Sequence, residues 1–347
     1  MLHRLQNPWR GYGLPAVGLA PLTDAGGVAE LLAKCPAHAP TPLHDMPALA
    51  AELGVARISL KDERQRMGLG SFKALGAAFA IAREASMTGA GDIQQALQER
   101  VYVTASAGNH GMSVAAGARL FGARAVIFLS IAVPEAFAER LRAKGAEVVR
   151  AGADYEASMQ AAAEAAQLRG WTLLSDSSWP GYTELPLRVM EGYLQLAAEA
   201  IAQIDTVPSH ILLQAGVGGL AAAVAAHARL VWGDGPQVII VEPQAAPALM
   251  EGIRAGQVVD TSGPVSCMGR LDCKTASMIA LNGLAREADV FVTISETDAI
   301  GGAELLSAHG LPTTPSGAAG VAALRAGLDV PADAHVLAIL SEGPEDG

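Results

Sequence analysis

The alternation of short apolar strands with helical segments is the feature that most limits the fold of this chain. Apolar strands are predicted at Val101–Ala105, Ala125–Leu129, Ala146–Arg150 and Trp171–Leu174, with a helical pattern between each pair. The remaining predicted strands are Ala56–Asp62, His210–Gln214, Val238–Val241, Val290–Ile294 and Val336–Leu340. Because strands joined by helices run parallel through right-handed crossovers, the chain is expected to be α/β.

These strands are too many for a single sheet, so we expect two α/β domains, each a mostly parallel twisted sheet flanked by helices. The smaller domain is expected over residues 77–183, and the larger over 1–76 and 184–347. Helices are predicted at Ala25–Lys34, Pro47–Gly54, Ser71–Ala85, Gly108–Phe121, Pro134–Lys144, Tyr155–Leu168, Glu184–Ile204, Gly218–Val231, Ala246–Ala255, Glu296–His309 and Gly317–Leu328.

Composition excludes several classes of function. The net charge is −11 and only 4% of residues are aromatic, which argues against nucleic-acid binding. Mean hydropathy is +0.29, but no apolar run reaches the ~18 residues of a membrane span. The N-terminus lacks an apolar signal core, so we expect a cytoplasmic protein. Cys35, Cys267 and Cys273 are expected to be reduced thiols, without the histidines that would complete a metal site.

Open α/β sheets bind ligands at the carboxyl ends of their strands, and four loops there are candidates. The first is Gly68-Leu-Gly-Ser-Phe-Lys-Ala-Leu-Gly76, in which Lys73 enters a helix among apolar neighbours. A desolvated amine has a lowered pKa and can form a Schiff base. The alternative is an ordinary solvated helix lysine.

The second and third loops favour anion binding. Thr104-Ala-Ser-Ala-Gly-Asn-His-Gly111 follows a strand with small residues that expose backbone N–H groups at a helix start. Gln214-Ala-Gly-Val-Gly-Gly-Leu220 does the same, but without the spacing of a dinucleotide fingerprint or a P-loop. It therefore favours a single phosphate monoester. Each loop alone could equally be a plain Gly-rich turn.

The fourth loop is Leu340-Ser-Glu-Gly343. The hydroxyl of its serine could hydrogen-bond a heteroaromatic nitrogen; the alternative is a plain turn.

The order of the four loops along the chain resembles that of the fold-type II pyridoxal-phosphate enzymes, the tryptophan synthase β superfamily. Thr41-Pro-Leu and Ser316-Gly-Ala-Ala-Gly320 fit the same superfamily. Within it, Leu69-Gly-Ser-Phe-Lys-Ala-Leu-Gly-Ala77 resembles the diaminopropionate ammonia-lyases. The segment Ser266-Cys-Met-Gly-Arg-Leu-Asp-Cys273 likewise resembles the Met-Ala-Gly-Leu-x-Cys segment of those enzymes.

The resemblance implies pyridoxal 5'-phosphate in the cleft between the domains, bound covalently to Lys73, which also acts as the base at Cα. The implied cofactor-binding residues are Phe72 on the ring, Asn109 at the ring 3-oxygen, the phosphate loop of Gly216, Val217, Gly218, Gly219 and Leu220, and Ser341 at the ring nitrogen. The implied substrate-carboxylate site is Ser106, Ala107, Gly108 and His110. A neutral hydroxyl at the ring nitrogen suits β-elimination better than transamination.

The implied reaction is β-elimination of ammonia from 2,3-diaminopropionate or a related small amino acid, giving a 2-oxo acid. Alternatives are a dehydratase or racemase acting on serine, threonine or 3-hydroxyaspartate, and a non-catalytic binding protein, against which the retained Lys73 argues. A homodimer is expected, with a small amino acid as the only other partner and neither nucleic acid nor membrane. The 347-residue chain is expected to carry no appended regulatory domain.

One position departs from the ammonia-lyase pattern. Where that family has an aspartate before Gly-Asn-His, this chain has Ala107. A two-base mechanism would lose its second base there, so we expect specificity for the L isomer or for one face of the substrate. Two further questions stay open from the sequence: whether Cys267 and Cys273 pair, and whether Asp272, Cys273 and Lys274 touch the substrate or form a loop that packs against the dimer interface.

Overall fold

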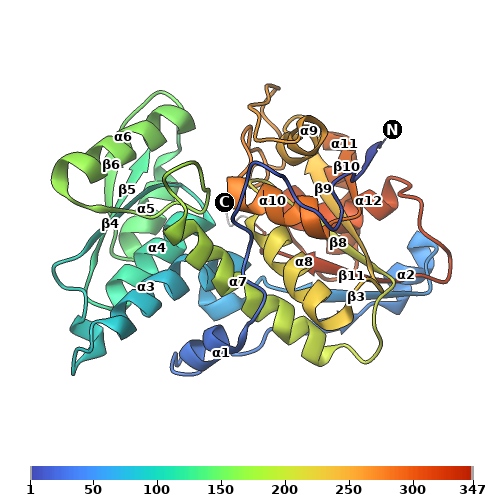
Figure 1. The fold of residues 1–347 in the computed structure, drawn as a ribbon, viewed down its shortest axis with the longest axis horizontal. Helices are drawn as coiled ribbons and strands as arrows, with labels where there is room; N and C mark the ends of the chain where they lie inside the picture. Colours follow the sequence, from blue (N-terminus) through green and yellow to red (C-terminus); the bar gives the residue numbers. More distant parts are fainter. Residues whose placement is uncertain (1, 345–347) are drawn as a thin grey trace.

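The computed structural model describes residues 2–344, which fold around two sheets (Figure 1). The larger sheet has the strand order β1-β10-β9-β8-β11-β3-β2. Its inner strands are parallel, and the edge strands β1 and β2 run antiparallel to β10 and β3. The bounds are β1 His3–Gln6, β2 Leu43–Asp45, β3 Arg57–Asp62, β8 His210–Gln214, β9 Gln237–Pro243, β10 Val290–Ile294 and β11 His335–Leu340.

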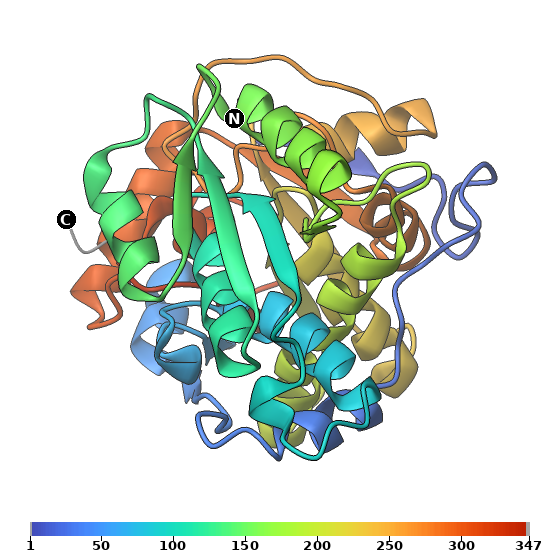
Figure 2. The ribbon, with the colours of Figure 1, turned by 90° about the vertical axis from the view of Figure 1, so that its left-hand side faces the viewer.

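The smaller sheet is parallel throughout, in the order β6-β5-β4-β7. Figure 2 shows it in front of the larger sheet, with helices on both of its faces. Its strands are β4 Val101–Ala105, β5 Arg124–Leu129, β6 Glu147–Arg150 and β7 Thr172–Leu173.

Helices cover both sheets. The α-helices are α1 Gly26–Leu32, α2 Pro47–Leu53, α3 Ala77–Met87, α4 Asn109–Leu120, α5 Glu135–Ala143, α6 Tyr155–Arg169, α7 Glu184–Gln203, α8 Gly219–Trp232, α9 Ala248–Ala255, α10 Met278–Glu287, α11 Glu296–Ala308 and α12 Pro315–Arg325. Short 3-10 turns lie at Arg66–Gly68, Phe72–Leu75 and Ile93–Gln95. No helix among the described residues has the length and apolar content needed to cross a bilayer.

The larger sheet is buried on both faces. Successive residues of a strand point to opposite faces, so neighbouring residues of β8 pack into different clusters. Ile211 and Leu213 pack into the same cluster as residues of α7, α8 and α10. Leu212, between them in β8, belongs instead to the cluster that contains α11 and α12 residues. This explains why the inner strands are continuous apolar runs rather than alternating ones.

The predicted two-sheet α/β architecture is confirmed. The helix predicted over Ser71–Ala85 is wrong in one respect, because the structure breaks it at Gly76 into a 3-10 turn and α3. A Cβ on Gly76 would lie 2.6 Å from the ring of Tyr193, so the chain bends where a glycine allows close approach. The sequence interpretation also missed β1, β2 and α10. The domain limits stay a prediction, and residues 1 and 345–347 lie outside the described chain.

A buried ionic cluster joins β3, the turn after it and α7. Lys61 and Arg66 are fully buried, and both contact the carboxylate of Glu199, at 2.8 Å and 2.7 Å. Arg66 also pairs with Glu63 at 2.7 Å, and the Thr41 hydroxyl donates to Glu63. Buried charges are tolerated only when they are paired and hydrogen-bonded, as here. The cluster therefore fixes the start of the segment that leads to Lys73.

We predict that Glu199→Gln lowers the free energy of unfolding by about 3–5 kcal/mol, because it leaves two buried cations with one fewer carboxylate. Burial alone would raise the pKa of Glu199, but Arg66 and Lys61 lower it to about 2. This part of the stability is therefore present above about pH 4.5 and is lost as the pH falls toward 2. Urea titrations at several pH values measure both effects. Glu147→Gln, which removes the exposed partner of Arg124, should change little.

Candidate active site

The first and fourth loops lie side by side at the end of β11. The Phe72 amide donates to the Ser341 carbonyl at 3.1 Å, and the Gly343 amide donates to the Gly70 carbonyl at 2.9 Å. A β-bridge also joins Ser71 to Glu342. The loop that carries Lys73 is thus attached by its backbone to the residues that follow the last strand.

The second and third loops meet the fourth through amide side chains. The Gln214 side chain, at the end of β8, donates to the Ser341 hydroxyl at 3.2 Å and to the Ile339 carbonyl at 2.8 Å. The Asn109 side chain, at the start of α4, donates to the Glu342 carboxylate. All four loops selected from the sequence therefore converge on one place.

The Lys73 amine lies in this convergence, paired with the carboxylate of Asp176. It also lies 5.2 Å from the ring centre of Phe72 and 5.8 Å from that of Tyr193. Burial disfavours the charged amine, but the Asp176 carboxylate outweighs this effect and raises the pKa of Lys73. For Asp176, burial opposes ionisation, yet the charge of the Lys73 ammonium and its hydrogen bond lower the pKa of Asp176. The pair is therefore ionic in the free protein.

Asp176 and Tyr193 were missed by the sequence interpretation. Asp176 does carry a signal, since it follows the strand ending at Leu174, and the sheet rule that selected the other loops applies to it as well. Tyr193 carries none, because it lies inside α7 among ordinary apolar positions. Burial, modulated by the nearby Lys73, raises the pKa of Tyr193 to about 12, so the phenol is neutral.

The glycine loop forms a cradle at the N-terminus of α8. Gly218 has φ +98°, a left-handed conformation that L side chains rarely adopt. A Cβ on Gly216 would lie 2.9 Å from the Cys273 sulfur, and one on Gly219 would lie 3.6 Å from the Tyr193 ring. Tyr193 thus lies between this loop and Lys73. The glycines let neighbouring residues pack closely against this loop, and the N–H groups at the start of a helix are suited to a phosphate.

The second loop places small residues before α4. The Ser106 hydroxyl accepts from the Gly108 amide at 3.3 Å, and Ala107 lies beside a cavity described below. His110 is buried, and its Nε2 lies 2.9 Å from the Leu174 carbonyl. Burial lowers the pKa of His110 despite the nearby Asp176, so the ring is neutral. Its ring thus joins α4 to the end of β7, and its role at a substrate carboxylate stays a prediction.

The three cysteines are free thiols, so Cys267 and Cys273 do not pair in this structure. Cys273 is held between the glycine loop and Lys73, and burial raises the pKa of its thiol to about 12. Lys274 donates to Asp272, to Ala245 and to Pro264, which accounts for it as a loop contact.

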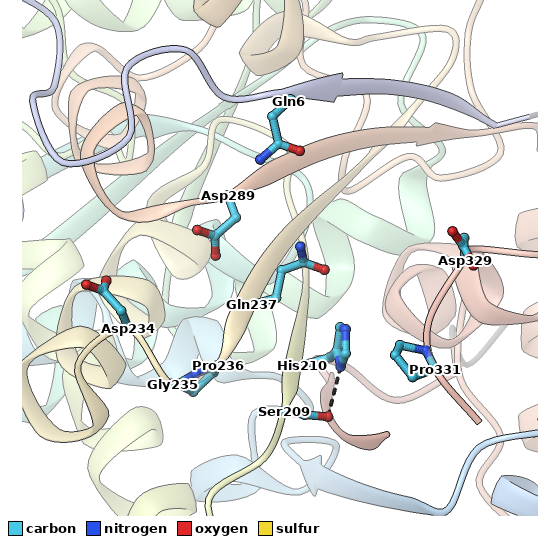
Figure 3. Close-up of a pocket in the computed structure, with 10 residues that line it drawn as sticks. All are labelled: Gln6, Ser209, His210, Asp234, Gly235, Pro236, Gln237, Asp289, Asp329 and Pro331. Atoms are coloured by element: carbon cyan, nitrogen blue, oxygen red, sulfur yellow. Dashed lines mark hydrogen bonds between the residues drawn. The ribbon is translucent and has the colours of Figure 1, made fainter. Parts of the chain in front are cut away.

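A separate polar hollow of about 570 Å³ lies at the opposite, amino end of the larger sheet (Figure 3). It is lined by the first residues of β8 and β9 and by Asp289, which already pairs with Arg10 and Arg229. Parallel sheets bind ligands at the other end, so we place the active site at the four loops.

The residues at the four loops fit pyridoxal phosphate. They combine a partly buried amine, a glycine-rich helix N-terminus, and an Asn and a Ser that hydrogen-bond within the same group of loops. In addition, the buried Ser71 hydroxyl and the Gln214 amide oxygen lack hydrogen-bond partners within residues 2–344. These features match a polar heteroaromatic ligand better than an apolar one.

Comparisons with known proteins agree with this chemistry. The chain is 32% identical to diaminopropionate ammonia-lyase of Salmonella typhimurium, over 89% of this chain and 86% of that protein. It is 28% identical to human serine dehydratase-like protein, over 87% of each chain. Its fold matches the Escherichia coli diaminopropionate ammonia lyase, solved with an aminoacrylate-PLP azomethine reaction intermediate. The TM-score is 0.88 and the identity 29%, covering 100% of this chain and 94% of that one.

The sequence model of one protein family, described as pyridoxal-phosphate dependent enzyme, matches residues 35–342, nearly the whole chain. The predicted cofactor and enzyme class are thereby confirmed. This chain belongs to the family of pyridoxal-phosphate dependent enzymes, among the relatives of diaminopropionate ammonia-lyase.

Proposed function

We propose that this enzyme removes ammonia by β-elimination from 2,3-diaminopropionate or a closely related small amino acid, leaving a 2-oxo acid. The observation that carries the proposal is the partly buried Lys73 amine, paired with Asp176 where the glycine-containing loops meet. The likeness to diaminopropionate ammonia-lyases over most of the chain supports the same reaction.

Pyridoxal phosphate, when bound, links covalently to amines and draws electrons away from Cα of an amino acid. In the proposed site Gly216–Leu220 hold its phosphate, while Asn109 and Ser341 hold polar atoms of the ring. Gln214 donates to the Ser341 hydroxyl, which fixes the position of that oxygen. Because Ser341 is a neutral group, it does not force a proton onto the ring nitrogen.

Proton handling centres on Lys73 and Asp176. The amine must lose a proton before it can bond covalently, and Asp176 is the carboxylate in contact with it. During turnover the released amine takes the Cα proton, while Asp176 stabilises the charge that appears on Nζ. Tyr193, neutral and packed beside both, keeps water away from this exchange.

We predict that Gly218→Ala weakens binding of pyridoxal phosphate. The added methyl would lie about 3.1 Å from Leu249 and 3.2 Å from Ala280, in a backbone conformation that favours glycine. Titration of the cofactor, followed by absorbance, measures the dissociation constant. Gly170→Ala is the matched control, since Gly170 has φ +66° but nothing within 4 Å of its Cβ position. Equal affinity of the two variants for pyridoxal phosphate would contradict the proposed phosphate site at the glycine loop.

We predict that Asp176→Asn moves cofactor attachment to lower pH. Without the carboxylate, burial becomes the main influence on Lys73 and lowers its pKa. The rate of appearance of absorbance near ~410–420 nm, measured from pH 6 to pH 10 after addition of pyridoxal phosphate, should reach half its maximum at a lower pH than in the native protein. Asp333→Asn, an exposed change, should leave the profile unmoved. An unchanged midpoint in Asp176→Asn would refute the assigned pairing.

The reaction itself is tested by detecting 2-oxo acid from L- and D-2,3-diaminopropionate. We expect the L isomer to be favoured by about 100-fold or more in kcat/KM, because Ala107 supplies no second base. Lys73→Ala should lose both the absorbance near ~410–420 nm and turnover. Equal rates for the two isomers would refute the stereochemical part, and a colourless, inactive native protein would refute the whole assignment.

A dehydratase acting on serine, threonine or 3-hydroxyaspartate is the second candidate. The Ser-Ala-Gly-Asn-His string and the likeness to human serine dehydratase-like protein favour it. Turnover of these hydroxy amino acids, with none of diaminopropionate, would select it.

We further propose a homodimer in the cytoplasm. The three free thiols suit a reducing compartment, and two-fold dimers are the commonest oligomers of such enzymes. Light scattering on the purified protein tests the dimer.

A further inference from the structure

A cavity of about 390 Å³ adjoins the second loop at the proposed active site. Its walls include Ala107, Gly108 and Asn109 on one side and Gly70, close to Lys73 in sequence, on another. Because the second loop lines this cavity, a substrate carboxylate held by that loop would place the rest of the substrate beside it. The charge of the cavity therefore bears on which substituent is accepted.

Four cationic side chains line the cavity, Arg64, Arg140, Lys144 and Arg270, against one carboxylate among the described lining residues. Arg140 and Lys144 come from the end of α5, and within residues 2–344 neither has a carboxylate partner. Arg140 lies over the ring of Phe137, 4.5 Å from its centre, which holds the guanidinium in place. Arg64 also lines the cavity, but Asp62 pairs with it at 2.8 Å and balances its charge.

Arg270 reaches furthest toward the second loop. A Cβ added to Gly108 would lie 2.7 Å from its Nη1, so the guanidinium lies directly against the loop that we assign to the substrate carboxylate. The backbone amide of Arg270 donates to the Ser316 hydroxyl at 3.1 Å, which anchors the residue at its base. The side chain is 29% exposed, open to the cavity rather than enclosed in the core.

Glu342 is the carboxylate among the described lining residues, and its oxygens are engaged. One accepts from the Thr314 hydroxyl, and the other accepts from the Asn109 side chain and lies 3.7 Å from Arg270 Nε. It is therefore poorly placed to receive a second ammonium group of a substrate. Asp62 and Glu342 thus offset Arg64 and Arg270, and among the described lining residues the charges of Arg140 and Lys144 are the ones that favour an anion.

Ala107, the position where the ammonia-lyase pattern has an aspartate, also lines this cavity. The second loop therefore places no carboxylate there that could attract a cationic substituent.

We propose that the preferred substrate is an α-amino acid with a negatively charged group on Cβ, and that Arg270, assisted by Arg140 and Lys144, binds that group. The inference rests on the proposed β-elimination, and among the small amino acids which that proposal allows it favours an anionic one over diaminopropionate. A phosphate ester and a carboxylate share the required chemistry, whereas the β-ammonium of diaminopropionate opposes it.

The reaction balances for both anions. The Cα proton goes to Lys73, the bond from Cβ to its leaving group breaks, and the leaving group keeps the electron pair. With a phosphate ester, phosphate leaves and free 2-aminoacrylate results; water replaces its nitrogen, giving pyruvate and ammonia. With a β-carboxylate, the leaving group is the hydroxyl of 3-hydroxyaspartate, released as water, and the product is a 2-oxo dicarboxylic acid with ammonia.

The experiment compares kcat/KM of the holoenzyme for O-phospho-L-serine, L-3-hydroxyaspartate, L-serine and L-2,3-diaminopropionate. At least one anionic substrate should exceed serine and diaminopropionate by about 10-fold or more, and the better one identifies the anion. Arg270→Gln should lower kcat/KM for that substrate by about 10–100-fold, with a small effect on serine. Arg124→Gln, the same change at an exposed strand residue away from the cavity, should have no effect.

Binding without turnover provides the second readout. 2-Amino-3-phosphonopropionate carries its anion on a C–P bond, and 2-aminobutyrate is an amino acid of similar length whose side chain is uncharged. Calorimetric titration should show about 10–100-fold weaker binding of the phosphonate to Arg270→Gln and a smaller loss in Arg140→Gln. Binding of 2-aminobutyrate should stay unchanged. If Arg270→Gln fails to fold, Arg140→Gln still tests the anion site.

Three outcomes would overturn the inference. Equal losses for 2-aminobutyrate and the phosphonate would assign Arg270 to the α-carboxylate that all substrates share. Faster turnover of diaminopropionate than of either anionic substrate by the native enzyme would refute the anionic substrate class while leaving the ammonia-lyase proposal intact. A holoenzyme that binds the phosphonate no better than 2-aminobutyrate would do the same. By contrast, a protein that binds no pyridoxal phosphate and forms no 2-oxo acid would refute the proposed function itself.

Discussion

The position of β11 between β8 and β3 is the constraint on which the site depends. Its parallel register with both neighbours brings three strand ends to one edge of the sheet. Ser341 therefore lies beside Gln214, and the backbone after β3 returns to pair with the residues that follow Leu340. Segments more than a hundred residues apart in sequence meet there because the hydrogen bonds of the sheet leave them no other arrangement.

The segment after β3 needs a second restraint, since a loop of glycines is flexible by itself. The buried cluster of Lys61, Glu63, Arg66 and Glu199 supplies it, with charges that are acceptable in the core only in this arrangement. A strand edge and an ionic cluster thus confine the backbone of Lys73 from two sides. The amine is therefore held in position without a long regular helix around it. This is consistent with the division of the helical region at Gly76.

Strand order along the chain, strand identity and the four loops could be predicted from sequence, because burial on both faces makes inner parallel strands apolar and ligand loops follow their carboxyl ends. The short edge strand β1 could not, since its residues are polar and its pairing with β10 depends on a segment almost three hundred residues away. The contact between Tyr193 and Gly76 is equally invisible, because nothing in α7 marks that position. Asp176 could have been predicted, because it follows a strand of a parallel sheet. The position of Arg270 could not, because it depends on the contact between its loop and Gly108.

The ion pair of Lys73 with Asp176 has a consequence for the protein before it receives its cofactor. An active site built for a phosphate and a reactive amine would otherwise hold an unbalanced charge in a buried place, which favours local unfolding or aggregation. Here the amine is satisfied by a residue of the chain itself. The newly folded polypeptide therefore holds a balanced charge at Lys73 before any cofactor binds, and attachment of the cofactor must first separate this pair.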